Sequence, residues 1–286
     1  TSNDAATKYH AYVAVARFIS VFDAPSNMVM QVYRSLVRDS SERNNKVRAA
    51  IDVLLPVLRM RLSNDEVEIA QKYTVEVMRE ERNSITQMVH LWTSVTRYPE
   101  LFCSHKSEII PLMVQSLSFL GFQQSASLEL TSLTVDLAKL LFEWCAAKHT
   151  SESASSDQAT TPLAQHSGNI VVNTLVRLAF VTTAGRSDQP RERIRSHVLS
   201  VLKGFVSLGY NCDVNSVWFF REIRVQGINK YDKEAGRPLT RKVSSSIADG
   251  NGGVDMAPLV LGAKIILILL KHDPSNAFLE SNICSL

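Results

Sequence analysis

The stretch LTVDLAKLLFEWCAAKHT, residues 133–150, has the pattern that recurs through most of this 286-residue chain. Its apolar residues stand three or four positions apart, which is the spacing of one face of an α-helix. These residues are Leu133, Leu137, Leu140, Leu141 and Trp144. The stretch carries a continuous apolar stripe and no reactive group. It therefore predicts a helix that packs on neighbouring helices and takes no part in chemistry.

The composition is that of an ordinary soluble protein, with 45% hydrophobic and 21% charged residues. A formal net charge of +3 is too small to indicate a nucleic-acid or membrane partner by itself. The four cysteines form no CxxC pair, so we expect free thiols in a reducing compartment. They are Cys103, Cys145, Cys212 and Cys284. The opening TSNDAATKYH has no initiator Met and no signal-peptide core, and we interpret the chain as a piece of a longer protein.

Helical periodicity covers almost the whole chain outside two segments, and it predicts about a dozen helices. The predicted helices span residues 9–22, 25–39, 47–62, 64–82, 84–99, 105–121, 133–150, 169–183, 192–209, 214–225, 256–272 and 275–284. Pro56 lies inside one of them and predicts a kink or a helix break just before it. Asn64 is the expected N-cap of another.

Helices of this length, recurring in pairs about every 40 residues, are typical of stacked helical repeats. The predicted fold class is all-α, an α-solenoid of HEAT/armadillo-like helix pairs. A compact multi-helix bundle is the competing fold. We assign helical repeats to residues 1–149, 169–226 and 255–286, a flexible Ser/Thr-rich loop to 150–168 and a flexible polar loop to 227–254.

The sequence contains no recognisable catalytic, cofactor or metal motif. The seven histidines never fall at metal-ligand spacing, and no nucleophile-elbow, phosphate-loop or dinucleotide pattern occurs. We therefore expect no catalytic residue, no cofactor, no metal and no small-molecule substrate. The apolar run at 257–270 is too short to span a membrane and contains Lys264, so no membrane association is expected.

One local charge feature stands out, because residues 186–242 carry an excess of Lys and Arg over Asp and Glu. The candidate basic contact surface consists of Arg191, Arg193, Arg195, Arg221 and Arg224. The simplest interpretation is a solvated face. The alternative is weak contact with an acidic partner or nucleic acid. No aromatic platform accompanies these arginines, so direct nucleic-acid contact is not expected.

Several stretches, taken in order, are similar to one family. They are DAPSNMVMQVYRSLVR (23–38), VRAAIDVLLPVLRMRL (47–62), HLWTSVTRYPELF (90–102), IIPLMVQSLSFLG (109–121) and SLTVDLAKLLFEWC (132–145), with looser similarity over 193–220 and 259–278. The series resembles the helical-repeat region of the transformation/transcription domain-associated protein (TRRAP) family. The resemblance fails in the two loops.

The resemblance implies a segment of a very large pseudokinase of the phosphatidylinositol-3-kinase-like superfamily. Such a protein is a nuclear scaffold in SAGA-type and MYST-type histone acetyltransferase complexes. Its implied partners are acetyltransferase-complex subunits and transcriptional activators, which dock on the repeats. No catalytic residue of the superfamily can be carried over to this stretch.

Three other readings of the sequence remain open at this stage. The same repeats could belong to an active kinase of the superfamily. A generic HEAT adaptor would show a sustained acidic or hydrophobic track on its inner helices. A metal-dependent helical hydrolase would need clustered His and acidic residues, which are scattered here.

Overall fold

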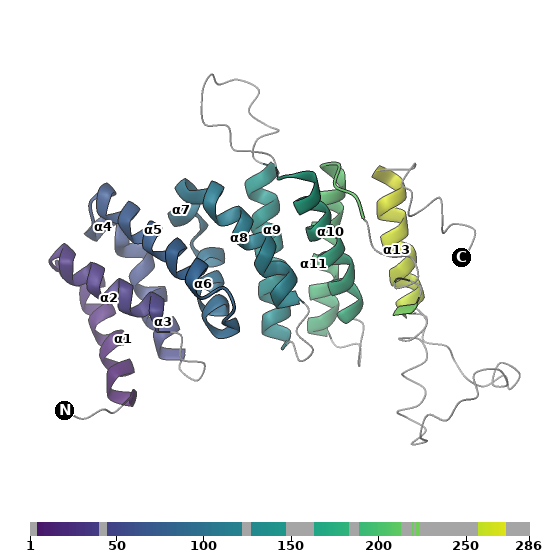
Figure 1. Cartoon of the computed structure of the whole chain (residues 1–286). Helices are drawn as coiled ribbons and strands as arrows, with labels where there is room; N and C mark the ends of the chain where they lie inside the picture. The colour runs from purple at the N-terminus through teal and green to yellow at the C-terminus, as the bar shows by residue number, and fades with distance from the viewer. Residues whose placement is uncertain are drawn as a thin grey trace, which may run out of the picture. The chain divides into compact units, whose positions relative to one another are not determined.

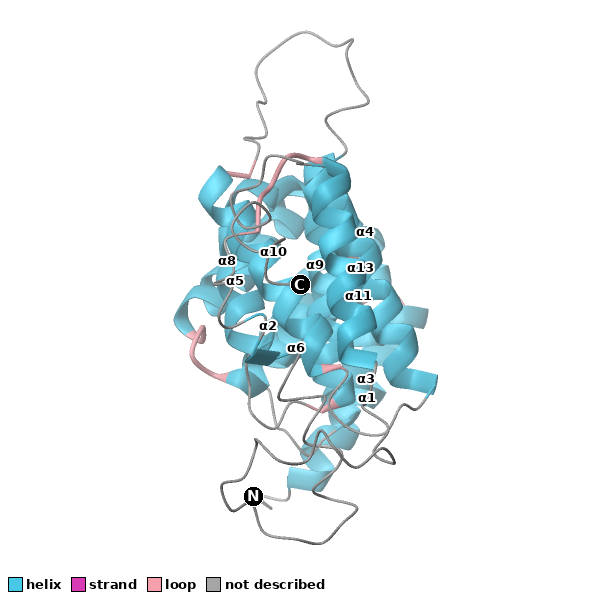
Figure 2. Ribbon diagram, turned by 90° about the vertical axis from the view of Figure 1, so that its right-hand side faces the viewer, coloured by secondary structure: helices cyan, strands magenta, loops and turns pink. Residues whose placement is uncertain are grey.

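The computed structural model describes residues 5–39, 45–121, 127–146, 163–182, 189–212, 219, 221, 222 and 257–272. Throughout these residues the regular secondary structure is helical, with no strand (Figure 2). The chain divides into two compact units, one formed by Thr1–Leu120 with Ser151–Thr161 and the other by Gly121–Thr150 with Pro162–Leu286. The all-α prediction is confirmed.

The first unit is a succession of short antiparallel helices (Figure 1). Its elements are α1 (Ala5–Val21), α2 (Ser26–Arg38), α3 (Asn45–Leu54), η1 (Leu55–Val57), α4 (Leu58–Arg61), α5 (Asn64–Glu80), α6 (Ile85–Arg97), α7 (Pro99–Phe102), η2 (Cys103–His105) and α8 (Lys106–Gly121). Helix α3 packs on α1 and on α6, while α2 packs on α5. Alternate helices therefore stack in two layers, as in HEAT repeats.

The break predicted at Pro56 is confirmed. Helix α3 ends at Leu54, and the 3₁₀ turn η1 carries the chain past the proline before α4 begins at Leu58. Proline lacks an N–H and its ring clashes with the preceding turn, so the α-helical ladder cannot continue through it. Leu54 and Leu58 are both fully buried, so the apolar stripe crosses the break.

The start of α5 lies one residue earlier than the sequence suggests. Ser63, and not Asn64, is the N-cap. The Ser63 hydroxyl accepts a hydrogen bond from the Glu66 N–H at 3.3 Å, and the Glu66 carboxylate accepts one from the Ser63 N–H at 2.9 Å. This reciprocal capping box satisfies two backbone donors that the helix itself leaves free. Asn64 offers a similar side chain, but only Ser63 has Glu at the third position after it.

The second unit contains α9 (Leu128–Ala146), α10 (Gln165–Val181), α11 (Gln189–Ser207) and α13 (Ala257–His272). Helix α11 packs against α9, α10 and α13. The stripe of the stretch 133–150 is the buried side of α9, and Leu137 and Leu141 have no exposed surface. Phe142 of the same helix meets Phe205 of α11 edge to face, with the ring centroids 5.7 Å apart. The expectation that this helix packs on its neighbours is confirmed.

The expected loop at 150–168 extends too far in the sequence-based assignment. Helix α10 begins at Gln165, and Gly168 is buried within it. Ser and Gly at this point resemble loop composition, but Gly168 is needed because the ring of Tyr210 lies directly against its backbone. The predicted polar loop 227–254 and the predicted helix 275–284 fall outside the described residues, as does most of 214–225.

Within the described part of the chain, no helix is both long enough and apolar enough to cross a membrane.

Candidate interaction surface

Side chains of one helix pair hydrogen-bond to the carbonyl ends of helices in the neighbouring pair. The Arg61 guanidinium donates to the Ile19 carbonyl at 2.9 Å and to the Ser20 carbonyl at 3.3 Å, and it forms an ion pair with Asp23. Ile19 and Ser20 belong to the last turn of α1, whose carbonyls have no partner inside their own helix. Arg61 therefore caps α1 from the end of α4.

Helix α2 is capped in the same way by α6. The His90 Nε2 and the Gln87 Nε2 lie 2.9 Å and 2.5 Å from the carbonyl oxygens of Leu36 and Val37. A carbonyl can only accept, so His90 carries its proton on Nε2. Burial lowers the pKa of His90 below its ordinary value, which keeps the ring neutral. These bonds fix the rotation of α6 relative to α2.

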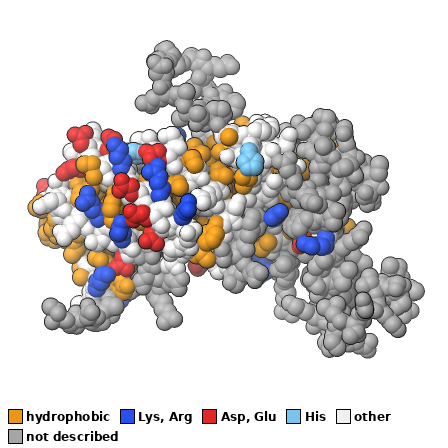
Figure 3. Space-filling model, viewed as in Figure 1, with side chains coloured by type: hydrophobic (Ala, Val, Ile, Leu, Met, Phe, Trp, Pro, Cys, Tyr) orange, Lys and Arg blue, Asp and Glu red, His pale blue; other side chains and the backbone are white. Residues whose placement is uncertain are grey.

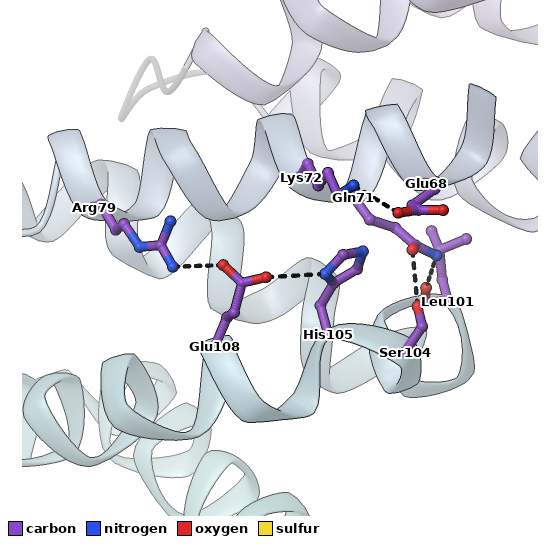
Figure 4. Close-up of polar contacts among 8 residues, drawn as sticks. All are labelled: Glu68, Gln71, Lys72, Arg79, Leu101, Ser104, His105 and Glu108. Atoms are coloured by element: carbon purple, nitrogen blue, oxygen red, sulfur yellow. Dashed lines mark hydrogen bonds and ion pairs between the residues drawn. The ribbon is translucent and has the colours of Figure 1, made fainter. Parts of the chain in front are cut away.

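A third group of polar contacts joins α5 to the α7–α8 segment (Figure 4). Gln71 donates from Nε2 to the Leu101 carbonyl and accepts at Oε1 from the Ser104 hydroxyl at 2.9 Å. Gln71 is only 4% exposed, so both ends of its amide must be satisfied inside the protein. This buried amide therefore ties α5 to the segment formed by α7 and η2.

Further along the same interface an ion cluster lies at the surface (Figure 4). Glu108 of α8 accepts from Arg79 of α5 at 2.6 Å, and its other oxygen lies 3.3 Å from Nδ1 of His105. Hydrogen bonds from Arg79 and then His105 lower the pKa of the Glu108 carboxyl. Because the carboxylate is partly exposed, its main contribution is to orientation, and its contribution to stability is small.

Polar contacts between helix pairs span between 30 residues, for Gln71–Leu101, and 54 residues, for His90–Leu36, and several others fall between these values. The Tyr33–Thr74 bond spans 41 residues, the Arg61–Ile19 bond 42 and the Tyr98–Asp52 bond 46. In the second unit, the bonds Tyr210–Leu163 and Asn211–Asn169 span 47 and 42 residues. One helix pair with its loops accounts for separations near the middle of this range, in agreement with the period of about 40 residues expected from the sequence.

The surface of the first unit carries charges of both signs. Figure 3 shows Lys and Arg interspersed with Asp and Glu over the N-terminal helices. Many of them are paired across or along helices, as in Arg38–Glu80 at 2.7 Å and Lys72–Glu68 at 2.6 Å. On the face seen in Figure 3 the described residues form no track of one sign, which a generic HEAT adaptor with an acidic groove would need.

Only some arginines of the candidate basic contact surface are exposed to a partner. Arg193 is exposed, and Arg221 is exposed with its guanidinium 3.9 Å from Glu222. Arg195 pairs with Glu192 and leaves 13% of its side chain exposed, while Arg191 is half-buried. Arg224 lies outside the described residues. Positions 191, 193 and 195 therefore do not share one face, as expected from their two-residue spacing on a helix.

Helix α1 has a second apolar face besides the one that packs on α3. It buries Ala16 and Ile19, but its other side exposes Phe18 (46%) and Val21 (69%), and Phe22, directly after the helix, is 57% exposed. The rings of Phe18 and Phe22 are in contact, with their centroids 5.1 Å apart. A helix with two apolar faces is the unit from which stacked repeats are built, because each face packs on a different neighbour.

In the described part of the chain no group of three or more His, Cys, Asp or Glu side chains could hold a metal ion. The cysteines that are described, Cys103, Cys145 and Cys212, are not joined in disulfides. The polar side chains that meet other helices do so at helix interfaces, where they form hydrogen bonds with backbone carbonyls. The sequence indicated that the histidines are not at metal-ligand spacing, but it did not single out Arg61, Gln71 or Gln87. Their only sequence signal is a polar residue inside a helical pattern.

The fold and these contacts define the chain as an α-solenoid of HEAT-like helix pairs. The family model for the Tra1 HEAT repeat ring region matches residues 1–161. The chain belongs to this family, which bears out the resemblance to TRRAP proteins found in the sequence. The matched residues are a HEAT repeat region, and a kinase domain is not what they resemble.

Curated relatives come from distant eukaryotes. The chain is 27% identical over 146 residues to the probable transcription-associated protein 1 of Dictyostelium discoideum, covering 50% of this chain and 3% of the relative. It is 27% identical over 142 residues to the human transformation/transcription domain-associated protein, covering 49% and 4%. It is 31% identical over 160 residues to the SAGA complex/NuA4 acetyltransferase complex subunit Tra1 of Schizosaccharomyces pombe, covering 54% and 4%.

The chain thus spans only 3–4% of the length of these relatives. No solved structure matches it.

Proposed function

We propose that this chain is a non-catalytic scaffold segment of a transcription coactivator in histone acetyltransferase complexes. Its partners are acetyltransferase-complex subunits of the SAGA and MYST types and transcriptional activators, and it works in the nucleus. The match of residues 1–161 to the Tra1 HEAT repeat ring region is the observation that carries this proposal. The Schizosaccharomyces pombe relative is named as a subunit of the SAGA and NuA4 acetyltransferase complexes, which supports it.

The physical basis of the role is the way in which the helix pairs are joined. Buried polar side chains such as Gln71, Gln87 and His90 each require a particular carbonyl of the adjacent pair. A misaligned pair would leave these groups buried and unsatisfied, at a cost of roughly 1–3 kcal/mol each. The stack therefore holds one register, and a surface with one register can present a constant pattern of side chains to partners.

The test is an affinity purification of the full-length protein from nuclear extract, read by mass spectrometry. Nuclease treatment before elution removes partners bridged by nucleic acid. Recovery of acetyltransferase-complex subunits in constant ratio supports the scaffold function. Recovery of DNA-repair or growth-signalling partners in their place would assign the chain to an active kinase of the superfamily and refute the proposal.

We further propose that a basic surface of this chain contacts some of these subunits. We assign it to Arg193 and Arg221, whose side chains are exposed. Changing both to Glu should remove some subunits from the same purification while leaving the rest of the complex intact. Lys264→Glu, at an exposed position of α13, provides the matched control for charge reversal. An unchanged list of subunits with the double variant would remove these residues from the interface.

A further inference from the structure

The first unit contains a small hollow where the end of α5 meets α6 and α8. It has a volume of about 50 Å³. A buried water needs roughly 10–15 Å³, so the hollow is large enough for the end of an apolar side chain. Its floor is formed by Met78 and Met88, which are 0% and 2% exposed. Leu112 and Phe119 form an apolar wall.

The lining suits an apolar group of variable shape. Methionine side chains are unbranched and polarizable, so they adapt to different shapes more readily than Leu or Ile. Phe119 is 36% exposed at the edge, which leaves part of its ring available for contact. A small recess with an adaptable apolar floor and an aromatic edge is the kind of pocket that an anchoring side chain fills in a protein interface.

The rim gives the hollow a charge preference. Arg82, Asn83 and Gln115 are exposed and line it, and none of its lining residues is Asp or Glu. Within the described residues Arg82 forms no ion pair, so its guanidinium is available for a partner. The N-terminal end of α6 begins two residues after Asn83 and adds partial positive charge. A carboxylate next to the inserted side chain would therefore be favoured, and a cation would be repelled.

We propose that this hollow is a docking site for a protein segment that inserts the end of one bulky apolar side chain and sets an Asp or Glu against Arg82. The proposal rests on the proposed scaffold function, because it names one place where a protein partner is held. Charge complementarity selects this occupant, since the hollow combines an apolar floor with a single unpaired guanidinium.

The test uses the full-length protein purified in its native assembly. The probe is a fluorescein-labelled acidic peptide with a single phenylalanine, and its binding is followed by fluorescence anisotropy. Two matched peptides serve as controls, one with the phenylalanine replaced by alanine and one with the acidic residues replaced by their amides. Both control peptides should bind at least tenfold more weakly than the parent peptide.

Two variants of the protein test the hollow itself. Arg82→Glu reverses an exposed charge and should weaken peptide binding about tenfold, because a charge-assisted contact becomes a repulsion. Ser116 is 5% exposed and lines the hollow, so Ser116→Met should fill it and block insertion of the phenylalanine. Arg17→Glu should leave binding unchanged, since Arg17 lies on α1 and is no part of the hollow.

The outcomes separate this inference from the proposed function. The same preparations are analysed for co-purifying acetyltransferase subunits. If the subunits are present but Arg82→Glu and Ser116→Met bind the peptide as tightly as the wild type, or if the wild type does not bind it, the docking site is refuted alone. If the subunits are absent from the wild-type preparation, the scaffold function fails whatever the peptide does. A thermal melt of Arg82→Glu that matches the wild type excludes unfolding as the cause of weaker binding.

Discussion

Gly168→Ala tests how closely α10 approaches the end of α11. A Cβ atom added to Gly168 would lie 2.0 Å from Cδ1 and 2.3 Å from Cε1 of Tyr210. Tyr210 is 7% exposed, and its hydroxyl donates to the Leu163 carbonyl at 3.0 Å. Its ring also packs on Phe205, with the centroids 6.0 Å apart. The ring therefore has to move by more than an ångström, and that movement strains or breaks its hydrogen bond.

The expected magnitude is a balance of opposing effects. Alanine in a helix is more favourable than glycine by about 1 kcal/mol. Overpacking a buried site costs about 1–3 kcal/mol, and a lost hydrogen bond about 1 kcal/mol. Gly168→Ala should therefore lower the free energy of unfolding by about 2 kcal/mol, although the same change in an open helix would raise it.

A double-mutant cycle with Tyr210→Ala isolates the clash. Denaturant unfolding of the 286-residue chain, followed by far-UV circular dichroism, gives the free energy of each variant. In the Tyr210→Ala background the ring is gone, so Gly168→Ala should become stabilising by up to about 1 kcal/mol. If Gly168→Ala stabilises the chain while Tyr210 is present, or if the two changes are additive, the contact between them is not the reason for the glycine.

Three further predictions concern the helix interfaces. Burial lowers the pKa of His90, so on acidification the unfolded chain binds a proton at His90 before the folded chain does. The free energy of unfolding should therefore fall as the pH drops below about 6.5. In denaturant titrations over a pH series, His90→Gln should reduce this fall. Tyr33→Phe removes the 2.5 Å bond to Thr74 and should cost about 1 kcal/mol in denaturant unfolding, whereas no loss would mean that the bond does not form. The isolated chain should self-associate at tens of micromolar through the exposed face of α1, and replacing Phe18 and Phe22 by Glu should reduce its mass in light scattering; a monodisperse wild-type monomer would contradict this.

Helix identity was predictable because it depends on short-range spacing. The break before Pro56 follows from the missing N–H of one residue, and the structure has it at Leu54. The start of α10 was not predictable in the same way. Ser167 and Gly168 have loop composition, and only the contact with Tyr210, 42 positions along the chain, explains why a glycine stands inside a helix.

For the interaction surface, too, the sequence identified candidate residues but not which of them are exposed. The five arginines of the candidate basic surface were identified by counting charge along the chain, which contains no information on burial. In the structure Arg195 pairs with Glu192 and is largely covered, whereas Arg193, only two residues away, is exposed. The hollow beside Arg82 is lined by residues of three helices and of the turn between α5 and α6, so no single stretch of sequence contains it.

The sequence alone determined that this protein is a stack of helix pairs in the TRRAP family, because apolar periodicity and ordered motifs are local properties of the chain. Only the tertiary structure decided which polar side chain meets which carbonyl, as for Arg61 with Ile19 and Gln71 with Leu101. The physical reason is that a buried polar group is stable only when its partner is present, and here the partners lie 42 and 30 residues away along the chain.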